Sequence, residues 1–176
     1  MRYSLIREMD ISNGSGIGIS LFVQGCHFHC KGCFNKETWD FNGGLEWNSD
    51  VKNKFIELAN KSYIKRISIL GGEPLAKENV EEVVNIILAL KIKYPEKQIW
   101  LYTGYLWENI MNSSDKYDIF RQTALFHADV VVDGQFQLEN QDIYNKEIIW
   151  AGSTNQRVID SKESFNQNKV VLYGES

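Results

Sequence analysis

Short, nearly continuous apolar runs recur along the chain, and each of the clear ones is followed within two residues by a glycine. Runs rich in Val, Ile and Leu are typical of strands that are buried on both faces of a sheet. Two weaker runs, near 147–150 and 169–173, indicate additional short strands. The clear runs, which we predict to be strands, are 17–23, 66–70, 98–102 and 128–133.

Between these runs, apolar residues recur at the three- and four-residue spacing of a helix. Ser49 can cap one helix, whose apolar residues lie at i, i+4 and i+7. A longer helix is predicted from Val80. We expect it to stop at Tyr94, because Pro95 disfavours helical geometry in the residue before it. One or two further helices are expected within about 105–127.

The alternation of strands and helices predicts βαβ units, and hence a parallel sheet with right-handed crossovers. We find no internal repeat and no linker, so we expect one domain over 1–176, with a tail at 160–176 to which the pattern assigns no role. A complete eightfold barrel needs about 250 residues, and the chain has 176. We therefore expect an α/β fold in the form of an incomplete, laterally open (β/α) barrel, whose open side can admit a macromolecule.

Composition and charge narrow the possible functions. The net charge is −4 and the Lys and Arg residues are dispersed, which argues against a surface that binds nucleic acid. No apolar run approaches the roughly 20 residues that span a bilayer, so we expect no membrane association. Acidic residues interrupt the start of the chain, where a signal peptide would be apolar. We therefore expect a cytoplasmic protein, in whose reducing surroundings clustered cysteines favour metal ligation over disulfides.

All three cysteines belong to one C-x3-C-x2-C motif, formed by Cys26, Cys30 and Cys33. Structural zinc sites and common iron–sulfur sites are closed by four ligands, so this motif is one ligand short. His27 or His29 could complete a zinc site, but the short gaps leave little freedom to wrap four ligands around one small ion. A cubane of four irons is larger. Three thiolates would leave one of its irons open to another molecule.

A second motif, Gly-Gly-Glu-Pro at 71–74, directly follows a predicted strand. By itself it is compatible with a tight turn, because glycine permits unusual backbone angles and proline enforces a break. The two glycines also expose backbone groups to a ligand, and the Glu73 carboxylate can accept a hydrogen bond from an ammonium group. Ligands of α/β folds gather at the carboxyl ends of strands. The side chains that follow predicted strands here are Cys26, Glu73, Thr103 and Asp133.

Together the two motifs resemble the signature of the radical S-adenosylmethionine superfamily. The resemblance implies a 4Fe-4S cluster held by Cys26, Cys30 and Cys33, whose open iron is chelated by the amino and carboxylate groups of S-adenosylmethionine. It also implies that an electron from the reduced cluster cleaves the sulfonium bond. Methionine and a 5′-deoxyadenosyl radical result, so no side chain is expected to be catalytic. The resemblance assigns S-adenosylmethionine binding to Gly32, Cys33, Phe34, Gly71, Gly72, Glu73, Pro74 and Thr103.

Several more segments, in the same order, resemble the family of activating proteins of the class III anaerobic ribonucleoside-triphosphate reductases. This resemblance covers about 3–159. The family often has Pro and Arg in the stretch held here by Ser15 and Gly18, and often has Asp in place of Glu73. The matching segments are 13–16, 21–26, 33–39, 101–105, 131–134 and 150–157.

The narrower resemblance implies a protein substrate. In that family the 5′-deoxyadenosyl radical takes a hydrogen atom from the α-carbon of a glycine in the reductase and leaves a glycyl radical there. The anaerobic ribonucleoside-triphosphate reductase is therefore both the expected partner and the expected substrate. A low-potential electron donor such as reduced flavodoxin is the second expected partner.

Other interpretations remain. Activating proteins of other glycyl-radical enzymes share both motifs, but many carry a ferredoxin-like insertion with extra cysteines, and no cysteine follows Cys33. A radical enzyme that acts on a small molecule, such as a deazapurine-forming synthase, fits the motifs and the length. An iron–sulfur electron carrier or a zinc-stabilised binding module would lack this chemistry altogether. Of the matching segments, 133–134 is equally compatible with a simple turn, and 153–157 could either pack the C-terminal region or meet the protein substrate.

Overall fold

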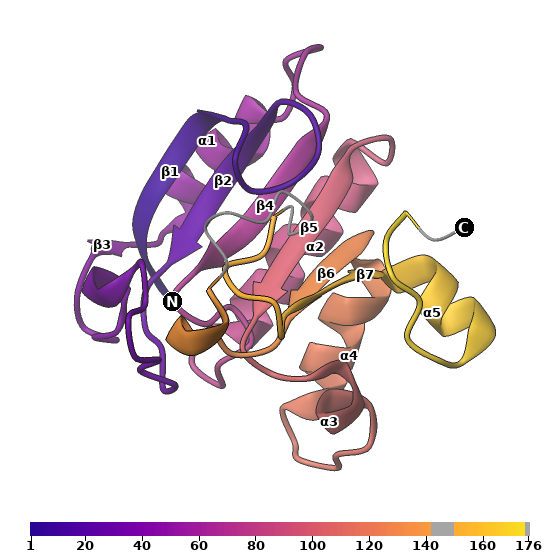
Figure 1. Cartoon of the computed structure of the whole chain (residues 1–176). Coiled ribbons are helices and arrows are strands. Elements are labelled where there is room, and N and C mark those ends of the chain that lie inside the picture. Colours follow the sequence, from indigo (N-terminus) through magenta and orange to yellow (C-terminus); the bar gives the residue numbers. More distant parts are fainter. Residues whose placement is uncertain (142–149, 175–176) are drawn as a thin grey trace.

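The structure, a computed structural model, describes residues 1–141 and 150–174. Its centre is one mixed sheet with the strand order β3-β1-β2-β4-β5-β6-β7 (Figure 1). The strands are β1 (Arg2–Asp10), β2 (Gly18–Val23), β3 (Leu45–Glu46), β4 (Arg66–Gly71), β5 (Gln98–Thr103), β6 (Val130–Asp133) and β7 (Arg157–Asp160). The helices are α1 (Ser49–Leu58), α2 (Val80–Lys93), α3 (Trp107–Met111), α4 (Asp118–His127) and α5 (Ser161–Gln167), with short 3-10 turns η1 (Lys36–Thr38) and η2 (Leu138–Asn140).

The centre of the sheet is parallel, because β2, β4, β5 and β6 pair in parallel. These are the four strands predicted from the apolar runs, and they are confirmed. The predicted parallel sheet is confirmed only for this centre, because β1 and β3 join one side antiparallel and β7 joins the other side antiparallel. Since β3 and β7 end the strand order without meeting, the sheet is open. An open α/β architecture was expected.

The antiparallel strand β1 has no counterpart in the sequence prediction. Most of its residues are exposed or half-buried, so its apolar residues do not form the continuous run that marks a strand buried on both faces. The strand β7 is similarly short and half-buried. Both were missed because burial on one side only leaves a weak pattern.

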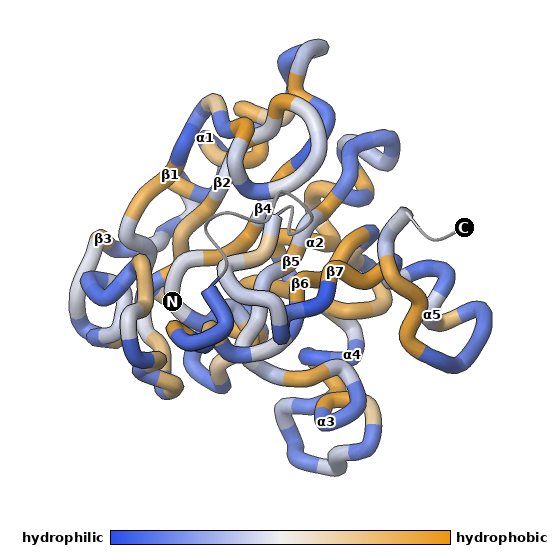
Figure 2. Tube along the Cα trace, in the orientation of Figure 1, coloured by the Kyte–Doolittle hydropathy of each residue, from blue (hydrophilic) through white to orange (hydrophobic). Residues whose placement is uncertain are grey.

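Alternate residues of the central strands face opposite layers. Ile19, Ile67 and Leu101 pack with the helices in the main core, whereas Trp100 and Val132 belong to a second apolar cluster. The helices α1, α2 and α4 cover the core side (Figure 1). Figure 2 shows apolar residues along the central strands and hydrophilic residues in the peripheral loops. The second face of the sheet is left to loops rather than helices.

The helices agree with the periodicity, apart from one cap. The helix α1 begins at Ser49, but its cap is Asn48, whose side chain accepts hydrogen bonds from the backbone N–H groups of Asp50 and Val51 at 3.1 Å. The helix α2 ends at Lys93, immediately before Tyr94, as predicted. The segment 105–127 holds two helices, α3 and α4. Among the described residues, no helix is long and apolar enough to cross a bilayer.

The C-terminal segment belongs to the sheet layer. After α5, the chain returns along β7, where the N–H of Asp160 donates to the carbonyl of Val171 and the N–H of Tyr173 donates to that of Val158, both at 2.9 Å. The run predicted near 169–173 forms only one isolated bridge, between Leu172 and Ile159. Of the run predicted near 147–150, residues 147–149 lie outside the described residues.

Candidate functional site

The cysteine loop begins where β2 ends. Its backbone turns through left-handed conformations at His29 and Gly32, with φ of 48° and 77°, and it is tied to the following segment because the N–H of Cys26 donates to the carbonyl of Trp39 at 3.1 Å. The three thiols are partly exposed. All three line one cavity of about 370 Å³.

The two histidines of this loop pack on aromatic rings. The His27 ring lies 4.4 Å from that of Phe41, and its Nε2 lies 3.0 Å from a carboxylate oxygen of Glu78. The His29 ring stacks on Trp39 at 4.5 Å. Within the described part of the chain, no three His, Cys, Asp or Glu side chains converge as ligands of a single ion.

The Gly-Gly-Glu motif is joined to the start of the cysteine loop. The N–H of Gly72 donates to the carbonyl of Val23 at 2.9 Å, and the N–H of Glu73 donates to that of Gly25 at 2.7 Å. A side chain at Gly72 would collide with the Gly25 carbonyl. Gly71 has a φ of 106°, which favours glycine. The glycines are therefore required for the close approach of two strand ends.

The side chain of Glu73 connects the ends of β4 and β5. One carboxylate oxygen accepts from the N–H of Leu75 and the hydroxyl of Thr103, both at 2.8 Å, and the other accepts from the N–H of Gly104 at 2.7 Å. Burial raises the pKa of Glu73 to about 7, although these donors favour the ionised form. The three donors to the Glu73 carboxylate are Leu75, Thr103 and Gly104, all within the protein. The Gly-Gly-Glu-Pro motif by itself did not predict these contacts.

The cavity gathers most of the residues assigned to ligand binding. Gly32 and Pro74 do not line it: Gly32 packs against Leu138, and Pro74 is buried. Phe34 is 63% exposed, and its ring lies 5.0 Å from that of Phe136 at the cavity. The predicted residues that line the cavity are Cys26, Cys30, Cys33, Phe34, Gly71, Gly72, Glu73 and Thr103.

Further lining residues come from segments that the motifs did not identify as ligand-binding. The Tyr102 hydroxyl and the Trp39 indole N–H are buried without a hydrogen-bond partner, and both residues line the cavity. They leave polar groups free for a ligand. The period of two along β5 could have identified Tyr102. The other lining residues outside the assigned set include Ser12, Asn13, Phe28, Gln135, Phe136 and Trp150.

Asp133 and the segment 153–157 hold the walls of the cavity. The buried Asp133 carboxylate accepts from the N–H of Trp107 at 2.8 Å and from Nε of Arg157 at 2.9 Å. The Gln156 side chain accepts from the N–H of Gly152 and donates to the carbonyl of Gly134, both at 2.8 Å. These contacts favour the packing interpretation of 153–157, and they give Asp133 a structural role beyond that of a simple turn.

Gly18 is one of the departures from the resembled family, which often has an arginine in this stretch. Its in-register neighbour on β4 is Arg66. A Cβ atom at Gly18 would lie 2.7 Å from Cγ and 2.9 Å from Cζ of Arg66. The neighbouring strand therefore places a guanidinium group beside this position.

The donor chemistry of the cavity fits an iron–sulfur cluster. In such a cluster each thiolate binds a different iron, so the thiols must surround a space rather than converge on one point. Cys26, Cys30 and Cys33 line one such space, together with unpaired polar groups from other segments.

Comparison with known proteins agrees with this chemistry. A family model described as a 4Fe-4S single cluster domain matches residues 12–159. A protein of Enterobacteria phage T4 is 35% identical over 158 residues, which cover 90% of this chain and 93% of that protein. Proteins of Salmonella typhimurium and Escherichia coli K12 are 36% and 35% identical over 160 residues, covering 90% of this chain and 97% of each. All three are named anaerobic ribonucleoside-triphosphate reductase-activating protein.

Proposed function

Because this chain belongs to the family of anaerobic ribonucleoside-triphosphate reductase-activating proteins and carries a 4Fe-4S single cluster domain, we propose that it is a radical S-adenosylmethionine enzyme that generates the glycyl radical of such a reductase. The observation that carries the proposal is the cavity shared by three thiols and the Gly-Gly-Glu strand end. On this proposal, residues 1–176 form a single radical S-adenosylmethionine domain, and its open sheet is an incomplete barrel of that type.

Cys26, Cys30 and Cys33 would hold the 4Fe-4S cluster and leave one iron for the amino and carboxylate groups of S-adenosylmethionine. When bound, the reduced cluster and S-adenosylmethionine supply methionine and a 5′-deoxyadenosyl radical, which removes a hydrogen atom from the α-carbon of a glycine in the reductase. Gly71 and Gly72 line the cavity and would present backbone groups to a bound ligand. Glu73 orients Thr103 through its carboxylate.

The remaining walls have supporting roles. The Tyr102 hydroxyl and the Trp39 indole N–H offer unpaired hydrogen-bonding groups to a bound molecule. The Phe34 and Phe136 rings pack together beside the thiols and would exclude water from reactive species. The thiols are partly exposed, which supports electron delivery from an external low-potential donor such as reduced flavodoxin.

The test is anaerobic reconstitution of the protein with iron and sulfide, followed by dithionite and S-adenosylmethionine. We expect 5′-deoxyadenosine and methionine in equal amounts. With the cognate reductase added, electron paramagnetic resonance should show the doublet of a glycyl radical. Absence of 5′-deoxyadenosine would refute the radical chemistry. Cleavage without a glycyl radical would favour a small-molecule substrate.

A further inference from the structure

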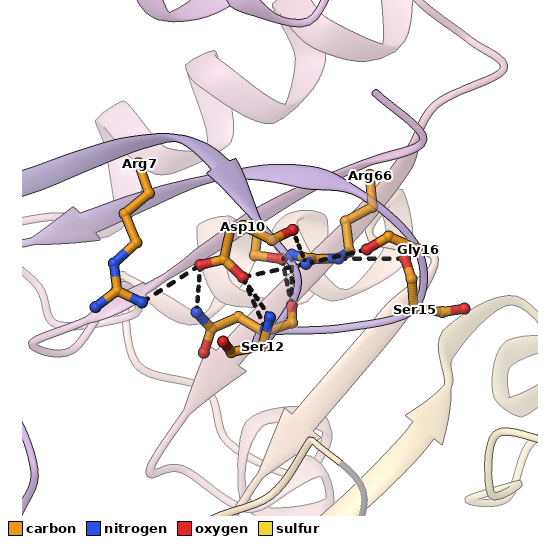
Figure 3. Close-up of polar contacts among 8 residues, drawn as sticks. Arg7, Asp10, Ser12, Ser15, Gly16 and Arg66 are labelled. Carbon is orange, nitrogen blue, oxygen red and sulfur yellow. Dashed lines mark hydrogen bonds and ion pairs between the residues drawn. The ribbon is translucent and has the colours of Figure 1, made fainter. Parts of the chain in front are cut away.

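The guanidinium group of Arg66 lies on the face of the sheet opposite the main core and is fully buried. An arginine stays charged in a protein, and a buried charge is destabilising unless it is paired and hydrogen-bonded. Each of its three nitrogens donates to the loop that joins β1 to β2 (Figure 3). The acceptors in that loop are the carbonyls of Asn13 at 2.8 Å, Ser15 at 3.2 Å and Gly16 at 3.4 Å. Asp10, the last residue of β1, accepts through its carbonyl at 2.7 Å and through a carboxylate oxygen at 3.2 Å.

Asp10 holds the same loop from its beginning. Its carboxylate accepts from the N–H groups of Ser12 at 2.8 Å and Asn13 at 3.0 Å, and from the Asn13 amide at 2.6 Å. The Ser68 hydroxyl donates to the Asn13 carbonyl at 2.5 Å. The backbone at Ser12 and Asn13 is therefore held from β1 on one side and from β4 on the other.

This loop forms one wall of the cavity, which we call the loop wall. Ser12 and Asn13 line the cavity together with the cysteines. The Asn13 carbonyl is hydrogen-bonded to Ser68, which lies in the middle of β4. Ser68 precedes Gly71, the last residue of β4, by three positions, about 10 Å at 3.3 Å per residue. The cavity therefore extends from the thiols along the sheet, with Tyr102 between its two ends.

We propose that Arg66 is a positioning residue that holds Ser12 and Asn13 as the wall against which the hydrogen-donating glycine of the protein substrate lies. This rests on the proposed function. If S-adenosylmethionine is anchored at the thiols and the Gly-Gly-Glu end, the group that gives up the hydrogen atom lies beyond it, towards the loop wall formed by Ser12 and Asn13. The α-C–H bond of the glycine breaks, a C–H bond forms at the 5′-carbon, and the unpaired electron stays on the glycine.

Four variants test the inference. Arg66→Gly removes the anchor. Gly18→Arg in the Arg66→Gly background sends a guanidinium through the same space from the facing strand, because the Gly18 Cβ position lies 2.7 Å from Arg66 Cγ. Ser12→Phe alters the wall while keeping the backbone N–H that Asp10 binds. Lys97→Met is the control, since this buried cation binds the Ile64 carbonyl at 2.7 Å, away from the cavity.

The experiment measures three quantities on each anaerobic holoprotein. These are the change in the electron paramagnetic resonance spectrum of the reduced cluster on adding S-adenosylmethionine, the number of glycyl radicals per 5′-deoxyadenosine, and the deuterium recovered in 5′-deoxyadenosine from reductase with deuterated glycine. For Arg66→Gly and Ser12→Phe we expect an unchanged spectral response but about tenfold fewer glycyl radicals per cleavage, since small misplacements have large kinetic effects. The double variant Gly18→Arg, Arg66→Gly should recover most of the lost glycyl radicals per 5′-deoxyadenosine, and Lys97→Met should give the same number as the unsubstituted protein.

The outcomes separate this inference from the proposed function. If the unsubstituted protein forms no 5′-deoxyadenosine, the proposed function fails. If the unsubstituted protein forms 5′-deoxyadenosine, and Arg66→Gly and Ser12→Phe give as many glycyl radicals per 5′-deoxyadenosine as it does, then Ser12 and Asn13 do not position the glycine. A lost spectral response in both variants would assign the wall to S-adenosylmethionine and overturn the glycine assignment. If Arg66→Gly does not fold, Ser12→Phe decides, because Ser12 is exposed.

Discussion

Glu73 links the parts of the candidate site at the scale of one residue. Its N–H donates to the Gly25 carbonyl beside the first cysteine, while its carboxylate accepts from Thr103 at the end of β5 and from Gly104, which follows it. A buried carboxylate with several donors joins two strands more firmly than an exposed one, because its hydrogen bonds do not compete with water. The residue therefore has a structural role besides any contact with a ligand.

The Glu73 carboxyl should make stability depend on pH. Its pKa is about 7 in the folded protein, against an ordinary value of 4.5, so the folded state binds more protons between these values and stability falls as pH rises through that window. Glu73→Gln removes this titration. We expect the free energy of unfolding of the parent protein, relative to that of the variant, to fall by on the order of 3 kcal/mol between pH 4.5 and 7. Urea unfolding of the metal-free, reduced protein measures it, and parallel pH profiles would contradict the assignment.

Cys30 provides the residue-scale test of cluster ligation. We expect Cys30→Ala to abolish stable cluster binding, because two thiolates leave two irons without protein ligands. His27→Ala is the matched control, because the His27 ring packs on Phe41 and does not line the cavity. Iron and sulfide analysis after anaerobic reconstitution gives the answer. Full iron content in Cys30→Ala, or its loss in His27→Ala, would require another ligand set.

At the scale of elements, the connection from β1 to β2 depends on one carboxylate at the end of β1. Burial by itself would raise the pKa of Asp10, but hydrogen bonds from Asn13 and Ser12 outweigh it and lower the pKa to about 2. Arg66 from β4 adds a buried ion pair at 3.2 Å. The loop is thus held by charge and hydrogen bonds rather than by apolar packing.

Asp10→Asn should destabilise the protein at neutral pH and lose most of that effect in acid. The Asp10 pKa of about 2 lies below the ordinary 3.8, so its stabilising contribution is fully present above pH 3.8 and disappears as pH falls through 2. From this shift we expect Asp10→Asn to lower the free energy of unfolding by about 2 kcal/mol at pH 7. Urea unfolding at pH 7, and again at the lowest pH at which both proteins fold, measures the difference. A penalty that does not shrink in acid would mean that lost packing, not the charge, is responsible.

At the scale of the whole molecule, the two faces of the sheet have different coverings. Helices build the core on one face. The other carries the cavity, the β1–β2 loop and a cluster in which Tyr173 from the C-terminal segment lies 5.3 Å from Trp100 and 6.2 Å from Trp150. Trp150 also lines the cavity. The last part of the chain therefore supports a wall of the site.

Tyr173→Ser should destabilise the whole fold, because it removes aromatic contacts with a fully buried Trp100. Aromatic pairs contribute about 0.5–1.5 kcal/mol beyond area burial, so we expect a loss of about 2 kcal/mol. Tyr63→Ser is the control, because Tyr63 is 44% exposed. Urea unfolding followed by tryptophan fluorescence measures both, and equal stabilities would mean that the C-terminal segment is dispensable for the fold.

The sequence predicted those features of the structure that depend on neighbouring residues, and it missed those that depend on distant contacts. The strands β2, β4, β5 and β6 were predicted because burial on both faces leaves continuous apolar runs. The cap Asn48, the strand β1 and the partners of Glu73 were not, because each depends on exposure or on contacts with distant segments. The assigned ligand residues that line the cavity were likewise marked by local motifs.

The sequence by itself determined the number and spacing of thiols, the glycines at the end of β4 and the central strands. These features depend on residues that are neighbours in the sequence, because ligand count, backbone freedom and hydrophobic periodicity are local properties. Only the tertiary structure decided that Arg66 would hold the loop carrying Ser12 and Asn13, and that this loop would share a cavity with the cysteines. Such contacts join residues more than fifty positions apart, and no local pattern records which distant groups a buried charge will find.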